Sequence, residues 1–214
     1  MKVVVVDYGS GNLRSVAKAL SLAVLDINRE YEVVVSADPD LLCCSDYIVL
    51  PGVGAFGDCF AGLTAINGMI ESLNDSVISK GVPFLGICVG MQLMAERSAE
   101  HGEFGGLGWI GGEVMPIEPT DKGQKIPHMG WNELIQGSRV HPVLSSLKNG
   151  DHVYFVHSFA MQCTDEKHVL AMTEYGGQIA AIVGRDNLLG TQFHPEKSQA
   201  TGISLLNNFL QWRP

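Results

Sequence analysis

Cys88 lies in the segment of the sequence that most clearly suggests chemistry. Residues 86–90 read Gly-Ile-Cys-Val-Gly, the cysteine form of a pattern in which a buried strand turns sharply into a helix and exposes its central side chain. A helix N-terminus also favours the thiolate, which is the form of cysteine that attacks a carbonyl carbon. An inert buried cysteine needs no flanking glycines, so the pattern predicts that Cys88 is a nucleophile.

A cysteine nucleophile needs a base and a group that orients the base. Among the seven histidines, His194 ends a predicted strand and is followed two positions later by Glu196. If the chain stays extended through Pro195, both side chains point to the same side, so the carboxylate can bind one imidazole nitrogen while the other faces the thiol. His157 is the competing base, but no acid lies two residues from it on either side.

A glycine-rich segment follows another predicted strand. Residues 52–57 read Gly-Val-Gly-Ala-Phe-Gly and precede a predicted helix, and Glu71 lies roughly 20 residues on, an arrangement typical of dinucleotide-binding loops. The same glycines equally suit a flexible peptide whose N–H groups face a negative charge. The segment alone leaves both interpretations open.

Alternating strands and helices are predicted to position these residues. Apolar and β-branched runs predict strands at 2–6, 32–35, 47–50 and 82–87, and helical spacing predicts helices at 12–24 and 58–79. The C-terminal half predicts strands at 112–117, 152–160, 168–173, 179–183 and 188–193 and a closing helix at 201–212. This order indicates an α/β fold with a mostly parallel central sheet flanked by helices and with antiparallel strands added in the C-terminal half.

Composition narrows the class of protein. The chain has 214 residues, 46% of them apolar, and a formal charge of −9, so we expect one globular domain over residues 1–214 and no binding to nucleic acid. Five cysteines without a C-x-x-C pair argue against a disulfide framework and a thiolate metal site. No apolar run approaches the roughly 20 residues of a membrane-spanning helix. We therefore expect a cytosolic protein that binds no metal and no membrane.

Three segments together resemble the class I, triad-type glutamine amidotransferases. They are residues 51–54 (PGVG), 86–92 (GICVGMQ) and 194–196 (HPE), in the order found in that family. The resemblance extends over essentially the whole chain and implies the family's flavodoxin-like three-layer architecture. It also implies hydrolysis of glutamine to glutamate and ammonia through Cys88, His194 and Glu196, with a thioester intermediate and no cofactor.

The resemblance further implies supporting roles for residues around this triad. The donors of an oxyanion hole are the N–H group of Val89 and one from the peptides of Gly52, Val53 and Gly54. The residues implied in substrate binding are Gln92, Ser158 and Phe159. Phe159 stands where related sequences often carry tyrosine, so no contact through a tyrosine hydroxyl is expected from it.

Residues 7–15, 127–133 and 154–159 resemble one branch of the family in particular. Members of that branch deliver ammonia to a (β/α)8-barrel cyclase subunit in histidine biosynthesis, so the resemblance implies a heterodimer. The positions that it implies at or near the interface are Asn12, Trp131 and Lys197.

Two alternative functions remain open from the sequence. A glutaminase subunit of another synthase, such as the one that makes pyridoxal 5'-phosphate, keeps the triad, although residues 127–133 speak against it. A non-enzymatic dinucleotide-binding module uses residues 52–57 instead and predicts nucleotide binding that survives loss of the Cys88 thiol. A cysteine protein of a related fold without a triad leaves residues 194–196 unexplained.

Overall fold

A mixed eight-stranded sheet forms the centre of the protein. The computed structural model describes residues 1–25, 27, 30–120, 123–137 and 140–214. From one edge to the other, the strands of the central sheet are β2 (Glu32–Ser36), β1 (Lys2–Val6), β3 (Tyr47–Gly52), β4 (Phe84–Cys88), β14 (Leu188–Thr191), β13 (Gln178–Arg185), β12 (Val169–Glu174) and β9 (Ile135–Gln136). The first five strands are parallel, and the last three are added antiparallel. The predicted fold class is confirmed.

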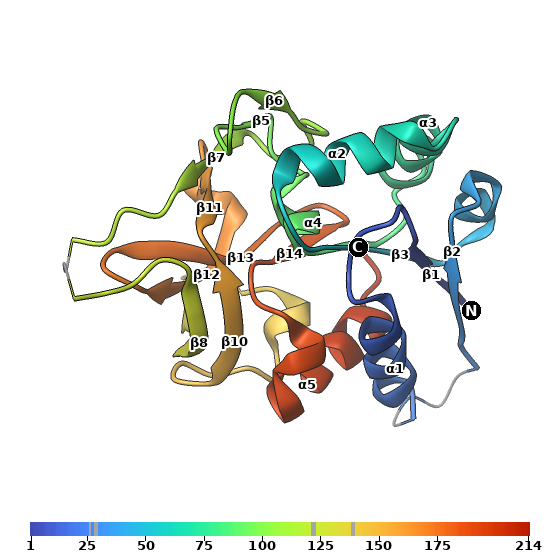
Figure 1. Ribbon diagram of the computed structural model, residues 1–214. Coiled ribbons are helices and arrows are strands. Elements are labelled where there is room, and N and C mark those ends of the chain that lie inside the picture. The colour runs from blue at the N-terminus through green and yellow to red at the C-terminus, as the bar shows by residue number, and fades with distance from the viewer. Residues whose placement is uncertain (26, 28–29, 121–122, 138–139) are drawn as a thin grey trace.

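Helices cover both faces of this sheet, which explains its continuous apolar strands. Residues Val3–Val6 are fully buried. Figure 1 shows α2 (Phe56–Ala65) and α3 (Met69–Leu73) on one face and α1 (Leu13–Ala23) and α5 (Gln199–Gln211) on the other. No helix in the described part of the chain is long and apolar enough to cross a membrane.

The single long helix predicted for residues 58–79 is wrong. The structure divides this segment into α2, α3 and a π-helical turn at Asn74–Ser79. The helix ends at Ala65 because Ile66 adopts an extended backbone, and Gly68 then precedes α3 with a φ of 80°. A left-handed residue cannot continue a right-handed helix, so the chain restarts there in a new direction.

The strand predicted for residues 152–160 is also wrong, because two strands occupy it. β10 (His152–His157) pairs with β8 (His128–Glu133), whereas β11 (Phe159–Cys163) pairs with β7 (Gly112–Pro116) in another sheet. The short strands β5 (Arg97–Ser98) and β6 (Phe104–Gly105) complete that second sheet. The chain therefore changes sheets at Ser158, beside the carboxyl ends of the parallel strands.

The carboxyl ends of β3, β4 and β14 lie side by side, and the residues with predicted chemistry follow them. Gly52 at the end of β3 is in register with Cys88 at the end of β4. β14 pairs with β4 on its other side and leads directly into His194. In open α/β sheets this edge is where ligands bind.

Candidate active site

Cys88 occupies a strained corner between β4 and the short helix α4 (Val89–Gln92). Its φ of 55° and ψ of −112° lie outside the regions that a residue with a Cβ ordinarily adopts, and such strain gathers at functional sites. The flanking glycines make the corner possible. A Cβ on Gly90 would lie 1.8 Å from the carbonyl oxygen of Leu50, and one on Gly86 would lie 2.5 Å from the carbonyl oxygen of Gly90.

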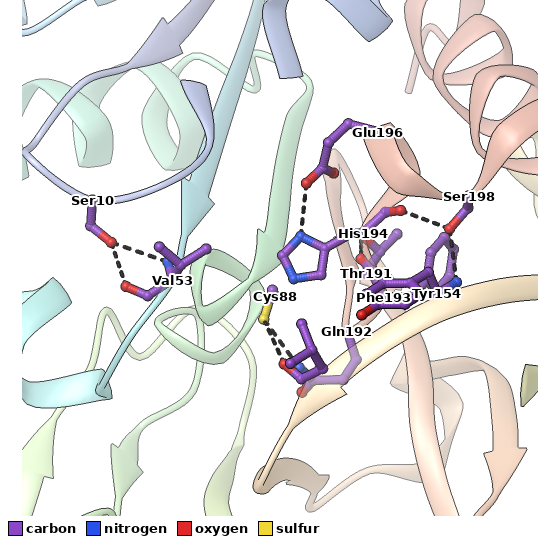
Figure 2. Close-up of polar contacts among 11 residues, drawn as sticks. Ser10, Val53, Cys88, Tyr154, Thr191, Gln192, Phe193, His194, Glu196 and Ser198 are labelled. Carbon is purple, nitrogen blue, oxygen red and sulfur yellow. Dashed lines mark hydrogen bonds and ion pairs between the residues drawn. The ribbon is translucent and has the colours of Figure 1, made fainter. Parts of the chain in front are cut away.

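His194 and Glu196 form a buried pair next to this corner. The imidazole Nδ1 lies 2.8 Å from the Glu196 carboxylate, and the two side chains are 2% and 1% exposed. Figure 2 shows the opposite edge of the ring turned toward the Cys88 sulfur. The chain does not stay extended through Pro195, because Pro195–Lys197 forms a 3-10 turn. The turn still brings the carboxylate to the ring.

The surroundings of His194 favour its protonated form. Burial lowers the pKa of this imidazole, but the nearby Cys88 sulfur and the Glu196 carboxylate, which favour the charged ring, outweigh burial and raise the pKa to about 9. A proton on His194 thus has an acidic partner on each side. The arrangement can hold a thiolate and an imidazolium side by side, which is the reactive form of a cysteine nucleophile.

The competing base, His157, is held in a different way. Its Nδ1 lies 2.8 Å from the carbonyl oxygen of Phe159, and its Nε2 lies 3.0 Å from Nδ1 of His128. Burial lowers the pKa of His157 to about 3 and that of His128 to about 4. Both nitrogens of His157 are engaged and the ring is neutral, so this histidine is poorly suited to take a proton from Cys88.

Two buried amides continue the site beneath the sulfur. The Gln92 amide nitrogen donates to the carbonyl oxygen of Phe159 and to the side-chain oxygen of Gln192, both at 3.0 Å. The Gln192 amide nitrogen donates to the Cys88 sulfur at 3.7 Å. Sequence reasoning missed Gln192, although it lies two residues before His194. Nothing in the sequence reveals that a side chain 104 positions away reaches Cys88.

The glycine-rich strand end is tied to Ser10. The Val53 N–H donates to the Ser10 hydroxyl at 3.1 Å, and this hydroxyl donates to the Val53 carbonyl oxygen at 2.6 Å. Figure 2 shows this pair on the far side of Val53 from Cys88. Gly54 follows with a φ of 97°, a conformation that glycine adopts without strain. In this structure the Val53 N–H therefore donates to Ser10 and is not available as a donor in front of the sulfur.

A cavity of about 280 Å³ opens in front of Cys88. Its lining includes the sequence-predicted residues Val53, Gly54, Val89, Gln92, Ser158, Phe159 and His194. Glu100, which sequence reasoning also missed, lines it as well. The volume lies near the lower end for small-molecule sites, which suits a ligand the size of an amino acid.

The position of Glu100 argues against dinucleotide binding by residues 52–57. Its carboxylate accepts the backbone N–H of Phe56 at 2.7 Å, at the start of α2. The helix N-terminus that would hold a pyrophosphate is thus occupied by an anion of the protein. The described residues contain no group of three or more His, Cys, Asp and Glu side chains arranged to hold a metal ion.

The predicted interface residues lie on the surface. Trp131 is 46% exposed and packs edge-on against Tyr154 with ring centroids 6.0 Å apart. The Lys197 ammonium lies 5.7 Å from the centre of the same Tyr154 ring. Asn12 is exposed at the start of α1, and α1 packs against the turn that carries Lys197. Trp131, Tyr154 and Lys197 form one patch, which we call the tryptophan patch.

Comparison with known protein sequences gives matches over the whole chain. The family described as glutamine amidotransferase class-I matches residues 4–212. The chain is 52% identical over 214 residues to a Rhodospirillum rubrum protein named imidazole glycerol phosphate synthase subunit HisH, and 51% identical over 217 residues to the Brucella suis protein of the same name. Each match covers 100% of both chains.

Solved structures share the fold at lower sequence identity. A crystal structure described as a glutamine amidotransferase superposes with a TM-score of 0.70 at 20% identity and covers 97% of both chains. The crystal structure of a glutamine amidotransferase from Thermotoga maritima superposes with a TM-score of 0.59 at 17% identity and covers 92% of this chain and 76% of its own. At these identities the likeness shows the fold alone.

Proposed function

The chain belongs to the class-I glutamine amidotransferase family, and from this premise we propose that it is the glutaminase subunit of an imidazole glycerol phosphate synthase. It releases ammonia from glutamine for use in histidine biosynthesis. Two observations support this assignment. One is the identity of about 50% over full length to proteins that carry that name, and the other is the juxtaposition of Cys88, His194 and Glu196.

The first half of the reaction transfers the glutamyl group to sulfur. The Cys88 thiolate attacks the carboxamide carbon of glutamine, forming a C–S bond and a tetrahedral intermediate with a negative oxygen. His194 then gives the proton on the nitrogen facing the sulfur to the departing amine, which leaves as ammonia when the C–N bond breaks. Glu196 holds the other ring nitrogen and stabilises the charged imidazole before that transfer.

The second half of the reaction returns the enzyme to its starting state. Neutral His194 takes a proton from a water molecule, and the resulting hydroxide attacks the thioester carbon. Breaking the C–S bond releases glutamate and restores the thiolate beside the imidazolium. No group besides this chain, glutamine and water is needed to balance the protons.

The oxyanion needs donors that this conformation supplies only in part. Val89 follows the nucleophile and lines the cavity, so its N–H is the first donor in the proposal. The second comes from the Gly52–Gly54 peptides after they turn, since the Val53 N–H donates to Ser10 here. Losing one oxyanion donor typically costs a factor of about 100 or more in rate, so glutaminase activity is low until that turn occurs.

The cavity also offers groups for the amino-acid end of glutamine. Glu100 places a carboxylate in the lining, which suits the α-ammonium of the substrate. Gln92 also lines the cavity, but both hydrogens of its amide nitrogen are donated to groups of the protein. Its contribution to binding is therefore through its oxygen. Ser158 and Phe159 form the wall where β10 gives way to β11.

We assign the tryptophan patch, with the nearby start of α1 at Asn12, to the cyclase subunit. Exposed aromatic side chains are enriched among the residues that anchor interfaces, and β8 also exposes Met129 beside Trp131. Lys197 lies three residues after His194 and lines the catalytic cavity as well. A cyclase bound here would therefore cover one side of the cavity and receive the ammonia directly.

The experiment that tests this proposal measures glutamine hydrolysis by the purified chain with and without the cyclase subunit. Cys163→Ala is the matched control, because Cys163 is a half-buried thiol on β11 that does not line the catalytic cavity. We expect turnover that is stimulated by the cyclase, retained in Cys163→Ala and lost in Cys88→Ala. Turnover that persists in Cys88→Ala, or that the cyclase leaves unchanged, contradicts the proposal.

A further inference from the structure

Gln192 makes a contact that the proposed reaction has not used. The side chain is fully buried directly after β14, and its amide nitrogen lies 3.7 Å from the Cys88 sulfur (Figure 2). The sulfur also lies 4.0 Å from the carbonyl oxygen of Val156. The nucleophile therefore rests between a donor and an acceptor that both belong to the protein.

The orientation of the Gln192 amide is fixed by its neighbours. The carbonyl oxygen of Phe159 can only accept, so the Gln92 atom that faces it must be nitrogen. That same nitrogen faces Gln192, so Gln192 must present its oxygen there. The remaining Gln192 atom, the amide nitrogen, is thereby directed at the sulfur. A flipped amide would place two donors against each other.

A second chain of hydrogen bonds anchors the shared Phe159 carbonyl. The Nδ1–H of His157 donates to it, which leaves Nε2 of His157 to accept from Nδ1–H of His128. His128 in turn presents Nε2 to the Asn132 amide nitrogen at 3.2 Å. Each ring carries one proton and uses both nitrogens, so the pattern has one consistent arrangement of donors and acceptors.

We propose that Gln192 is a positioning residue that holds the Cys88 thiolate in front of His194. A neutral thiol can donate its hydrogen to the Val156 carbonyl oxygen, whereas a thiolate cannot. The Gln192 N–H gains strength when the sulfur is charged, so it favours the ionised form and fixes its direction. This inference rests on the proposed function only in taking Cys88 as the nucleophile.

The test follows the rate of alkylation of Cys88 by iodoacetamide against pH, in the full-length chain, with the modified peptide identified by mass spectrometry. Gln192→Met keeps the shape of the side chain and removes the donor. Gln192→Glu keeps the shape and an acceptor but places a carboxylate against the sulfur. In both variants we expect the alkylation profile to move to higher pH, so that alkylation at the midpoint pH of the wild-type profile is several-fold slower.

Controls separate positioning from damage to the fold. Thr191→Val alters the neighbouring buried residue of β14, whose hydroxyl donates to the Phe193 carbonyl, so it perturbs the same strand without touching sulfur. We expect its profile to match the wild type. Cys43 and Cys44 are exposed thiols in every sample, so their alkylation must stay constant. In glutamine hydrolysis, kcat of the Gln192 variants falls about tenfold while KM changes less than twofold.

The outcomes distinguish this inference from the proposed function. A profile that does not move in a folded Gln192→Met or Gln192→Glu protein overturns the positioning role, even when Cys88 remains essential for turnover. Equal shifts in Thr191→Val and the Gln192 variants also overturn it, because they indicate a general loosening of β14. Glutamine hydrolysis that survives Cys88→Ala instead overturns the proposed function.

Discussion

Two buried histidines, His157 and His194, line the cavity in front of Cys88, and their surroundings favour opposite protonation states. His194 faces a carboxylate and a sulfur, which raise its pKa to about 9 despite burial. His157 faces a backbone carbonyl and the neutral ring of His128, and burial lowers its pKa to about 3. The difference lies in the partners and not in the depth of burial, since both side chains are nearly inaccessible.

The neighbours of a buried histidine therefore decide which role its side chain can have. A histidine with an ionisable neighbour on each side can store and move a proton. A histidine whose partners are neutral becomes a rigid donor and acceptor, which suits it to hold a carbonyl in place. The four predictions that follow challenge this division, beginning with the largest expected effect.

Replacing each histidine by asparagine should separate the two sites most strongly. With the cyclase present, we expect His194→Asn to lower kcat by about 10⁴-fold or more, since triad members act as a unit. His157→Asn should lower it by about tenfold or less, because it loosens only the support of Phe159. Steady-state glutamine hydrolysis checks both variants. Equal losses would show that the division between the two sites is wrong.

Removing the charge from the partner of His194 should give the next largest effect. Glu196→Gln keeps the side-chain shape but takes away the negative charge that stabilises the imidazolium. We expect kcat to fall by about 100-fold to 10⁴-fold, measured by ammonia release with the cyclase. The pH at which activity is half-maximal should change as well. Near-normal turnover in this variant would show that catalysis does not need the negative charge of Glu196 beside the imidazole.

The inner pair, His128 and His157, should make the protein sensitive to acid. The folded pKa values of both histidines lie below the usual 6.5, so the unfolded chain binds more protons at moderately acidic pH. These groups therefore contribute stability above about pH 6.5, which is lost as the pH falls toward 4 and then 3. For His157 the full loss is on the order of 5 kcal/mol, measurable by urea unfolding at several pH values.

A matched variant sharpens this prediction. His128→Phe keeps the stacking of the ring on Phe155 and Tyr175 but cannot titrate. Its free energy of unfolding should depend less steeply on pH between 6.5 and 4 than that of the wild type, although it is less stable at pH 7 because His157 loses a donor. An unchanged slope would mean that the inner pair is charged in the folded protein.

His194 should make the free energy of unfolding depend less strongly on pH than the inner pair does, and with the opposite sign. Its folded pKa of about 9 exceeds the unfolded value of 6.5, so its stabilising contribution is complete below about pH 6.5 and is lost as the pH rises toward 9. The loss is on the order of 3 kcal/mol. We expect the difference in unfolding free energy between wild type and His194→Gln to narrow across that range. A constant difference would contradict the charged state assigned to His194.

Local patterns in the sequence point to most residues of the candidate site, and those that they missed depend on contacts between distant parts of the chain. The glycines around Cys88 and the two-residue spacing of His194 and Glu196 are readable from the chain because each acts through neighbouring residues. The partners of Gln192 lie 100 and 104 positions away. No periodicity encodes such contacts, and the same holds for the pairing of His128 with His157 across β8 and β10.

The errors in the fold have a similar cause. Residues 58–79 keep an apolar helical spacing, but the extended backbone at Ile66 and the left-handed backbone at Gly68 interrupt the helix. Residues 152–160 keep an apolar run, but tertiary pairing sends its two halves to different sheets at Ser158. The strand at β1 was predicted without such an error, because a short, continuous run of β-branched residues is typical of a parallel strand that is buried on both faces.

The central claim, that sulfur, imidazole and carboxylate act as one catalytic unit, is tested most directly by trapping the covalent intermediate. The complex with the cyclase is mixed with glutamine, quenched in acid within the turnover time and digested for peptide mass spectrometry. The account predicts a glutamyl adduct on the peptide that contains Cys88 in the wild type, and none in His194→Asn or on Cys163. Glutamine hydrolysis without any adduct on Cys88, or an adduct that forms at full rate in His194→Asn, would contradict it.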